Sequence, residues 1–126
     1  MPTLQIIETA YRATLEEQDD PIVWLTHAMR GAGAELSVLL RGNAVNYAVR
    51  TQDSSNLHIG DWTQREPPRL ANDLLGLMGK GVPVHAVAED LAQRGIAARG
   101  VIDGIQSIPH AKLASFIAGH ERVWHW

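Results

Sequence analysis

The 126-residue chain contains no cysteine. Without a thiol it can form no disulfide, no cysteinyl metal site and no thiolate nucleophile. This absence excludes thiol catalysis and disulfide exchange. It also means that cysteine usage gives no indication of the redox environment of the protein.

An excess of positive charge is also missing. Eleven Lys and Arg stand against 14 Asp and Glu, and the formal net charge is −3 at pH 7. Nucleic-acid binding usually requires a basic face, so we expect no nucleic-acid partner.

Long apolar runs are absent as well. No stretch approaches the roughly 20 residues of a membrane-spanning helix, and the amino terminus lacks the pattern of a secretory signal. We therefore expect a cytoplasmic protein without membrane association, with residues 1–126 forming one domain.

Segments of strand and helix character alternate along the chain. Alternation of this kind predicts an α/β fold, in which parallel strands are joined by right-handed crossovers and covered by helices on both faces. The strand order does not follow from the pattern. Strands are expected at 4–9, 34–42, 82–87, 104–108 and 122–126, helices at 20–33, 43–49, 67–81, 88–95 and 109–120, and a long loop at 51–66.

The helix at 20–33 has the clearest start signal. Asp20 is expected to cap it, and Pro21 suits its first turn because no amide hydrogen is needed there. Ile22, Leu25 and Met29 are expected to form its buried stripe.

Polar side chains follow the first three expected strands. Parallel α/β sheets bind ligands at the carboxyl ends of their strands, where helix amino termini present free amides. We therefore expect a pocket for a small ligand, for example an anion, at this edge. Its expected residues are Thr9, Tyr11, Arg12, Gly42, Asn43, Val87, Ala88, Glu89 and Asp90.

These residues also have structural interpretations. Glu89 and Asp90 stand in the first turn of an expected helix, where carboxylates are favoured as caps over catalytic groups. Gly42 and Asn43 suit a turn between strand and helix. Neither a glycine-rich phosphate motif nor a GxSxG nucleophile motif is present, so we predict no catalytic residue and no cofactor.

The six histidines are scattered, with no HExxH motif. A site assembled in space, for example around His58 and Asp61, is the metal alternative, although we expect no metal. His85 falls within an expected strand and is predicted to pack or hydrogen-bond there.

The chain ends in a Trp-His-Trp segment at 124–126. Exposed tryptophans on a terminal strand are typical of interface cores. Association of subunits and packing beneath the first helix are equally favoured for this segment.

Taken together, four segments resemble the DsrE/DsrF-like family of small α/β proteins, in order and spacing more than in identity. They are 33–45, 79–96, 101–117 and 120–126. The resemblance implies a three-layer α/β/α domain with a mainly parallel sheet of about five strands, assembled as a trimer or hexamer. It also implies that the persulfide-carrying cysteine of sulfur-relay members maps onto Val87 or a residue within one or two of it. No persulfide can form there, and the loop at 11–20 also departs from the family pattern.

Three functional hypotheses follow. The leading one is a cysteine-free DsrE-like protein that acts by assembly as a homo-oligomer or by binding a small ligand. The second is a small enzyme that uses Glu89 or Asp90 as acid or base beside Arg12, or a histidine-bound metal. The third is a non-catalytic subunit that shapes the site of a cysteine-bearing relative.

Overall fold

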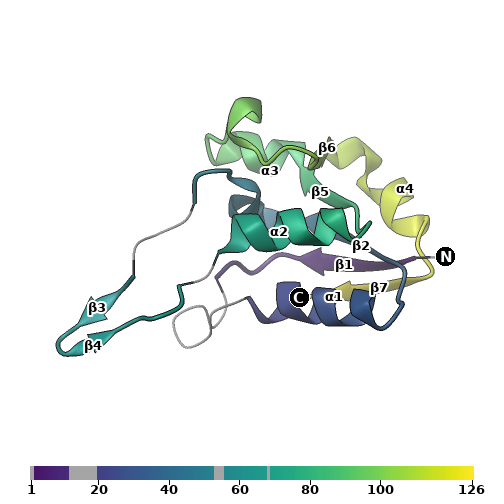
Figure 1. Cartoon of the computed structure of the whole chain (residues 1–126). Helices are drawn as coiled ribbons and strands as arrows, with labels where there is room; N and C mark the ends of the chain where they lie inside the picture. Colours follow the sequence, from purple (N-terminus) through teal and green to yellow (C-terminus); the bar gives the residue numbers. More distant parts are fainter. Residues whose placement is uncertain (1, 12–19, 53–55, 68) are drawn as a thin grey trace.

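The computed structural model describes residues 2–11, 20–52, 56–67 and 69–126. A sheet of five parallel strands forms its centre, in the spatial order β6-β5-β2-β1-β7 (Figure 1). Helices cover both faces, which confirms the predicted three-layer α/β/α class. The strands are β1 (Thr3–Ile7), β2 (Leu36–Leu40), β5 (Val84–Val87), β6 (Gln106–Ile108) and β7 (Arg122–His125).

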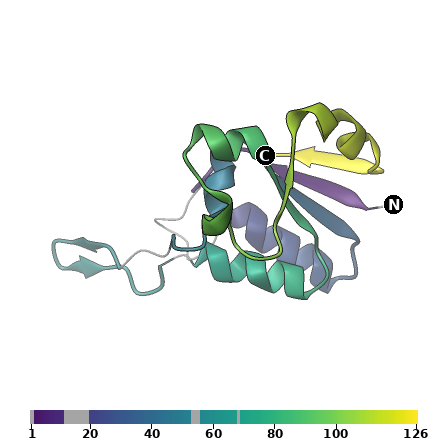
Figure 2. The same cartoon turned by 90° about the horizontal axis from the view of Figure 1, so that it is seen from above.

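Two longer helices lie on one face of the sheet, α1 (Pro21–Gly31) and α2 (Leu70–Gly79), and α4 (Leu113–Ala118) lies on the other (Figure 2). Alternate strand residues supply the two cores because successive side chains point to opposite faces. Val38 and Leu40 pack with the α1 and α2 side, and Leu39 packs with Leu113 of α4.

The central strand β2 is buried on both faces. All five residues from Leu36 to Leu40 are buried, including the polar Ser37. Strands in the middle of a parallel sheet are covered on both sides, and this position explains the burial of both faces.

Asp20 caps α1 as predicted. Its Oδ1 accepts hydrogen bonds from the backbone N–H groups of Ile22 (2.9 Å) and Val23 (3.1 Å). The buried stripe is Ile22, Val23 and Thr26, so the expectation for Leu25 and Met29, both half-buried, is corrected. Thr26 can be buried because its hydroxyl donates to the carbonyl of Ile22 at 2.7 Å.

The expected loop at 51–66 contains an antiparallel hairpin. Its strands are β3 (His58–Ile59) and β4 (Trp62–Thr63), and it projects away from the sheet (Figures 1 and 2). Gly60 has φ +56°, a conformation that two-residue hairpin turns require of their first central residue.

Short helices complete the connections. They are η1 (Gly42–Ala48), α3 (Ala88–Gln93), η2 (Ala98–Gly100) and η3 (His110–Lys112). The single helix expected at 109–120 is therefore η3 followed directly by α4.

The two carboxyl-terminal tryptophans differ in burial. The Trp126 indole Nε1 donates to Gln5 Oε1 at 2.9 Å, and its ring packs against the core. Trp124 lies on the edge strand β7 and remains 43% exposed.

His85 packs within the sheet as predicted. Its ring centroid lies 4.7 Å from that of Phe116 on α4. Burial lowers the pKa of His85 below its ordinary value of 6.5, because a low-dielectric environment disfavours the charged imidazolium.

Candidate functional site

The carboxyl ends of β1, β2 and β5 meet at one edge of the sheet. The loop after β1, helix η1 after β2 and helix α3 after β5 all start there (Figure 1). Backbone hydrogen bonds tie the first two together: Arg41 N donates to Ile7 O at 3.0 Å, and Ala44 N donates to Glu8 O at 3.1 Å.

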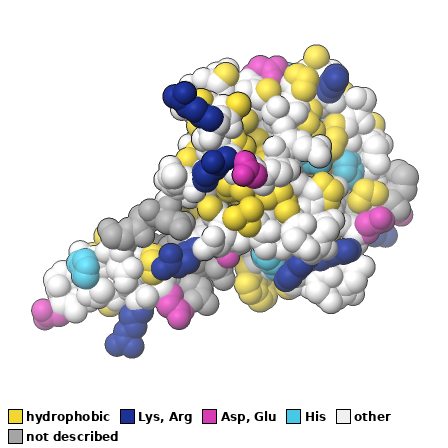
Figure 3. Space-filling model, turned by 45° about the horizontal axis from the view of Figure 1, so that its top comes forward, with side chains coloured by type: hydrophobic (Ala, Val, Ile, Leu, Met, Phe, Trp, Pro, Cys, Tyr) yellow, Lys and Arg dark blue, Asp and Glu magenta, His cyan; other side chains and the backbone are white. Residues whose placement is uncertain are grey.

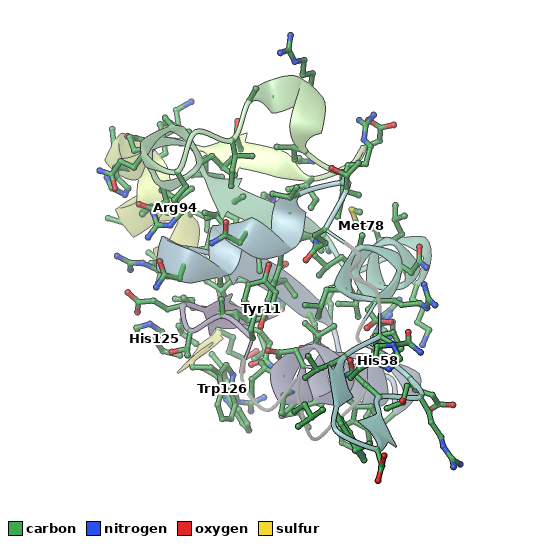
Figure 4. All side chains as sticks on the ribbon, turned by 90° about the vertical axis from the view of Figure 1, so that its left-hand side faces the viewer. Tyr11, His58, Met78, Arg94, His125 and Trp126 are labelled. Atoms are coloured by element: carbon green, nitrogen blue, oxygen red, sulfur yellow. The ribbon has the colours of Figure 1, made fainter. Side chains whose placement is uncertain are left out.

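A pocket of about 540 Å³ opens at this edge. Of the residues expected in a ligand site, Thr9, Tyr11, Gly42 and Asn43 line it, and Figure 4 looks onto this end of the molecule with Tyr11 and Arg94 labelled. The full lining is Glu8, Thr9, Ala10, Tyr11, Gly42, Asn43, Asn46 and Arg94. We call it the carboxyl-edge pocket.

Arg94 forms the cationic wall of this pocket. Its Nη2 donates to Asn43 Oδ1 at 2.9 Å, and its Nη1 donates to the carbonyl of Asp90 at 3.2 Å. These bonds fix the guanidinium plane beside the asparagine amide. Because a guanidinium carries five N–H donors, Arg94 can hold these contacts and still donate to an anion in the pocket.

Glu8 adds a carboxylate to the lining of the pocket. Its Oε2 lies 2.6 Å from Nε2 of His125 on β7. Gly42 passes close to the same side chain: it has φ +56°, and a Cβ at this position would lie 3.1 Å from Glu8 Cγ. A side chain at position 42 would therefore be strained and would crowd the pocket wall.

A buried hydrogen-bond network positions the backbone of Tyr11. The hydroxyl of Tyr47, which is fully buried, accepts a hydrogen bond from Tyr11 N and donates to Asp20 Oδ2 at 2.5 Å. The two tyrosine rings meet edge to face with centroids 5.0 Å apart. Tyr11 has φ +56°, which is unusual for a residue other than glycine, and this network stabilises that conformation.

Burial also sets the protonation of this network. It raises the pKa of Tyr47 far above its ordinary value of 10.0, and the hydrogen bond to Asp20 adds to the increase. Burial likewise raises the pKa of Tyr11. Both phenols are therefore neutral donors and acceptors near pH 7.

Glu89 and Asp90 act as caps, but not for the helix that contains them. Asp90 Oδ2 accepts from the backbone N–H of Gly42 at 2.8 Å, at the start of η1. Both Glu89 carboxylate oxygens accept from the backbone N–H of His110, at 3.1 and 3.0 Å, at the start of η3. The capping interpretation holds, with its targets corrected.

The remaining expected residues lie elsewhere. Val87 is fully buried between the sheet and α4, and Ala88 lines a different pocket between α3 and β6. Arg12 lies outside the described residues. Val87 is therefore a core side chain and does not line the carboxyl-edge pocket.

Three residues of the site were not predicted from the sequence. Glu8 and Arg94 line the pocket, and His125 contacts the Glu8 carboxylate. Glu8 directly follows the strand at 3–7, which is a usable signal. Arg94 lies four residues after Asp90 on one helix face. His125 reaches the site only through the pairing of β7 with β1, which no local pattern indicates.

Across the described residues, no group of three or more His, Asp or Glu side chains is placed to hold a metal ion. His58 Nδ1 instead lies 3.0 Å from Thr63 Oγ1 across the hairpin. Within the same residues, no helix combines the length and apolar character needed to cross a membrane.

No family model matches this chain, and no curated protein matches its sequence. Solved structures do. The structure of the ychN protein from E. coli superposes with a TM-score of 0.74 at 20% identity and covers 100% of both chains.

Two proteins of unknown function also share the fold. MTH1491 from Methanobacterium thermoautotrophicum has a TM-score of 0.67 at 13% identity and covers 99% of this chain and 98% of its own. BT1422 from Bacteroides thetaiotaomicron has a TM-score of 0.68 at 15% identity and covers 98% of this chain and 94% of its own. At these identities the likeness establishes the fold: this chain has the three-layer α/β/α architecture of these proteins.

Proposed function

We propose that this chain is a cysteine-free DsrE-like protein that binds a small anionic ligand in the carboxyl-edge pocket and assembles as a homo-oligomer. The order and spacing of the four sequence segments and the shared fold support this assignment. The observation that carries the ligand proposal is the lining of the pocket, where Arg94 and the amides of Asn43 and Asn46 converge.

The chemistry of the pocket favours binding over covalent transfer. The Arg94 guanidinium and the side-chain amides of Asn43 and Asn46 carry N–H donors suited to oxyanions. The chain has no thiol, and none of the serines among the described residues lines this pocket. The ligand would be held by hydrogen bonds and charge, and no persulfide could be carried.

Isothermal titration calorimetry with thiosulfate, sulfate, phosphate and a nucleotide tests the ligand proposal. We expect saturable binding of at least one anion, weakened about tenfold or more by Arg94→Ala, which is about 1.4 kcal/mol. Arg122→Ala is the matched control, because it removes an arginine where β7 begins, at the opposite edge of the sheet. Absence of binding heat with all four anions would contradict the proposal.

Assembly is supported by the exposed tryptophans Trp24, Trp62 and Trp124, since aromatic side chains are enriched at protein interfaces. Sedimentation equilibrium over a concentration series gives the mass. A trimer or hexamer agrees with the proposal, and a monomer at every concentration contradicts the assembly part alone.

A further inference from the structure

Glu8 is the acidic member of the carboxyl-edge pocket. Of the described residues that line it, Glu8 alone carries a carboxylate and Arg94 alone carries a cationic side chain. The nearby carboxylate of Asp90 does not line the pocket, and its Oδ2 accepts the backbone N–H of Gly42 at 2.8 Å. A ligand bound among the described lining residues therefore meets one carboxylate, that of Glu8.

The two oxygens of this carboxylate face different neighbours. Oε2 lies 2.6 Å from Nε2 of His125 on the edge strand β7. Oε1 is turned toward Gly42 in the pocket lining, where a Cβ would lie 3.6 Å from it, and it makes no hydrogen bond with the described residues. Arg94 and His125 both lie at this end of the molecule (Figure 4). The contact with His125 thus holds the carboxylate in place and leaves Oε1 able to accept a hydrogen bond from a ligand.

The hydrogen-bond donors of the pocket come from other side chains. Asn43 Oδ1 accepts from Arg94 Nη2 at 2.9 Å, so the Asn43 amide presents its nitrogen, with two N–H groups, to a ligand. Asn46 Nδ2 donates one N–H to the carbonyl of Asn43 at 2.8 Å and has a second. An oxyanion in this pocket would accept hydrogen bonds from these groups through some of its oxygens and would meet Glu8 Oε1 with another.

Charges of both signs are interspersed on the surface of the protein. The formal net charge is −3, and on the face shown in Figure 3 the Lys and Arg side chains stand apart, with Asp and Glu side chains among them. Long-range attraction of anions requires a surface dominated by positive charge. The choice between two anions of similar size therefore depends on the bonds made inside the pocket.

We propose that Glu8 selects an oxyanion that carries its own O–H group, such as hydrogen phosphate, over sulfate. Near neutral pH every abundant form of inorganic phosphate carries an O–H group, which can donate to Glu8 Oε1 in a charge-assisted hydrogen bond. Sulfate is also tetrahedral but carries no O–H group at that pH, so one of its oxygens would meet the carboxylate as a like charge, which is unfavourable. Sulfate and thiosulfate keep the bonds from Arg94 and the asparagines, so we expect them to bind more weakly rather than not at all. This inference rests on the ligand part of the proposed function and names the class of anion.

Isothermal titration calorimetry of the native protein with phosphate and with sulfate, at pH 7 and equal ionic strength, tests the selection. We expect phosphate to bind at least tenfold more tightly than sulfate. Equal affinities, or tighter binding of sulfate, would overturn this inference while the anion-binding proposal stands. Binding of neither anion would also overturn it, and would contradict the proposed function as well if thiosulfate and the nucleotide also fail to bind.

Glu8→Gln tests whether this carboxylate is the source of the preference. Glutamine has nearly the same shape but replaces the charged acceptor with an amide that can donate. We therefore expect the ratio of phosphate affinity to sulfate affinity to fall at least fivefold, chiefly because sulfate binds more tightly. Asp61→Asn is the matched control, because it removes one negative charge in the hairpin, away from the pocket (Figure 1), and should leave the ratio unchanged. A ratio that Glu8→Gln does not change would overturn the inference, and the comparison in the native protein depends on neither variant.

Discussion

At the scale of single residues, Tyr47 links three parts of the chain that are distant in sequence. Its buried hydroxyl joins the cap of α1, at Asp20, to the backbone of Tyr11 in the carboxyl-edge pocket. One side chain therefore contributes both to stability and to the shape of the proposed site.

Tyr47→Phe is expected to lower the free energy of unfolding by about 1–3 kcal/mol, because it leaves Tyr11 N and Asp20 Oδ2 without this partner. Urea denaturation measures the loss. In a double-mutant cycle with Asp20→Ala, the double variant should lose less unfolding free energy than the sum of the two single losses, since both variants break the same bond. Additive losses would show that the bond contributes nothing.

The raised pKa of Tyr47 predicts a loss of stability in alkali. An unfolded tyrosine ionises near pH 10, whereas the folded state keeps Tyr47 neutral to higher pH. Its contribution is therefore fully present below about pH 10 and falls as the pH rises above that value. The unfolding free energy of Tyr47→Phe should fall less steeply between about pH 9.5 and 11. Parallel curves for the variant and the native protein would contradict this assignment.

The lowered pKa of His85 predicts the opposite dependence. Its contribution is present above the unfolded pKa of about 6.5 and is lost as the pH falls, because the unfolded chain binds the proton more readily. His85→Gln should reduce the loss of stability between about pH 7 and 5, by at most about 1.4 kcal/mol per pH unit. Denaturant titrations at several pH values measure this, and His58→Gln, which replaces an exposed histidine on the hairpin, is the control.

At the scale of elements, α3 organises the two short helices beside it. Asp90 caps η1 and Glu89 caps η3. The first turn of α3, directly after β5, therefore fixes where both short helices begin. The partners of both carboxylates are backbone amides.

Asp90→Ala is expected to cost about 1–3 kcal/mol of unfolding free energy, because the carboxylate is buried and its loss leaves Gly42 N without an acceptor. Glu89→Ala, at a more exposed cap, should cost about 0.5–1 kcal/mol. Thermal or chemical denaturation compares the two with Glu89→Gln, which keeps an acceptor oxygen. A neutral Asp90→Ala would contradict the capping role.

Sequence patterns predicted most of the elements and missed others for physical reasons. Strands and helices with buried periodic faces were found, as was the cap at Asp20. The hairpin was missed because its strands are two residues long and exposed, although Gly60 followed by Asp61 is a turn signal. Leu25 was placed in the core of α1 because periodicity does not show that Thr26 can satisfy its hydroxyl within the helix.

At the scale of the whole molecule, the site depended on contacts that the sequence does not display. Thr9, Tyr11, Gly42 and Asn43 could be grouped because the ends of parallel strands share one edge. Arg94 and His125 enter through the packing of α3 on η1 and the pairing of β7 with β1. Val87 could not be placed from sequence alone, because whether a strand end is open or covered depends on α4.

The central claim at this scale is the proposal that the carboxyl-edge pocket binds a small anion. The most direct test is an NMR titration of the ¹⁵N-labelled protein with thiosulfate, which reports binding and its location together. We predict saturable shifts at the amides of Thr9, Tyr11, Gly42, Asn43 and Arg94. Unchanged spectra at millimolar thiosulfate, or shifts confined to another surface, would contradict the account.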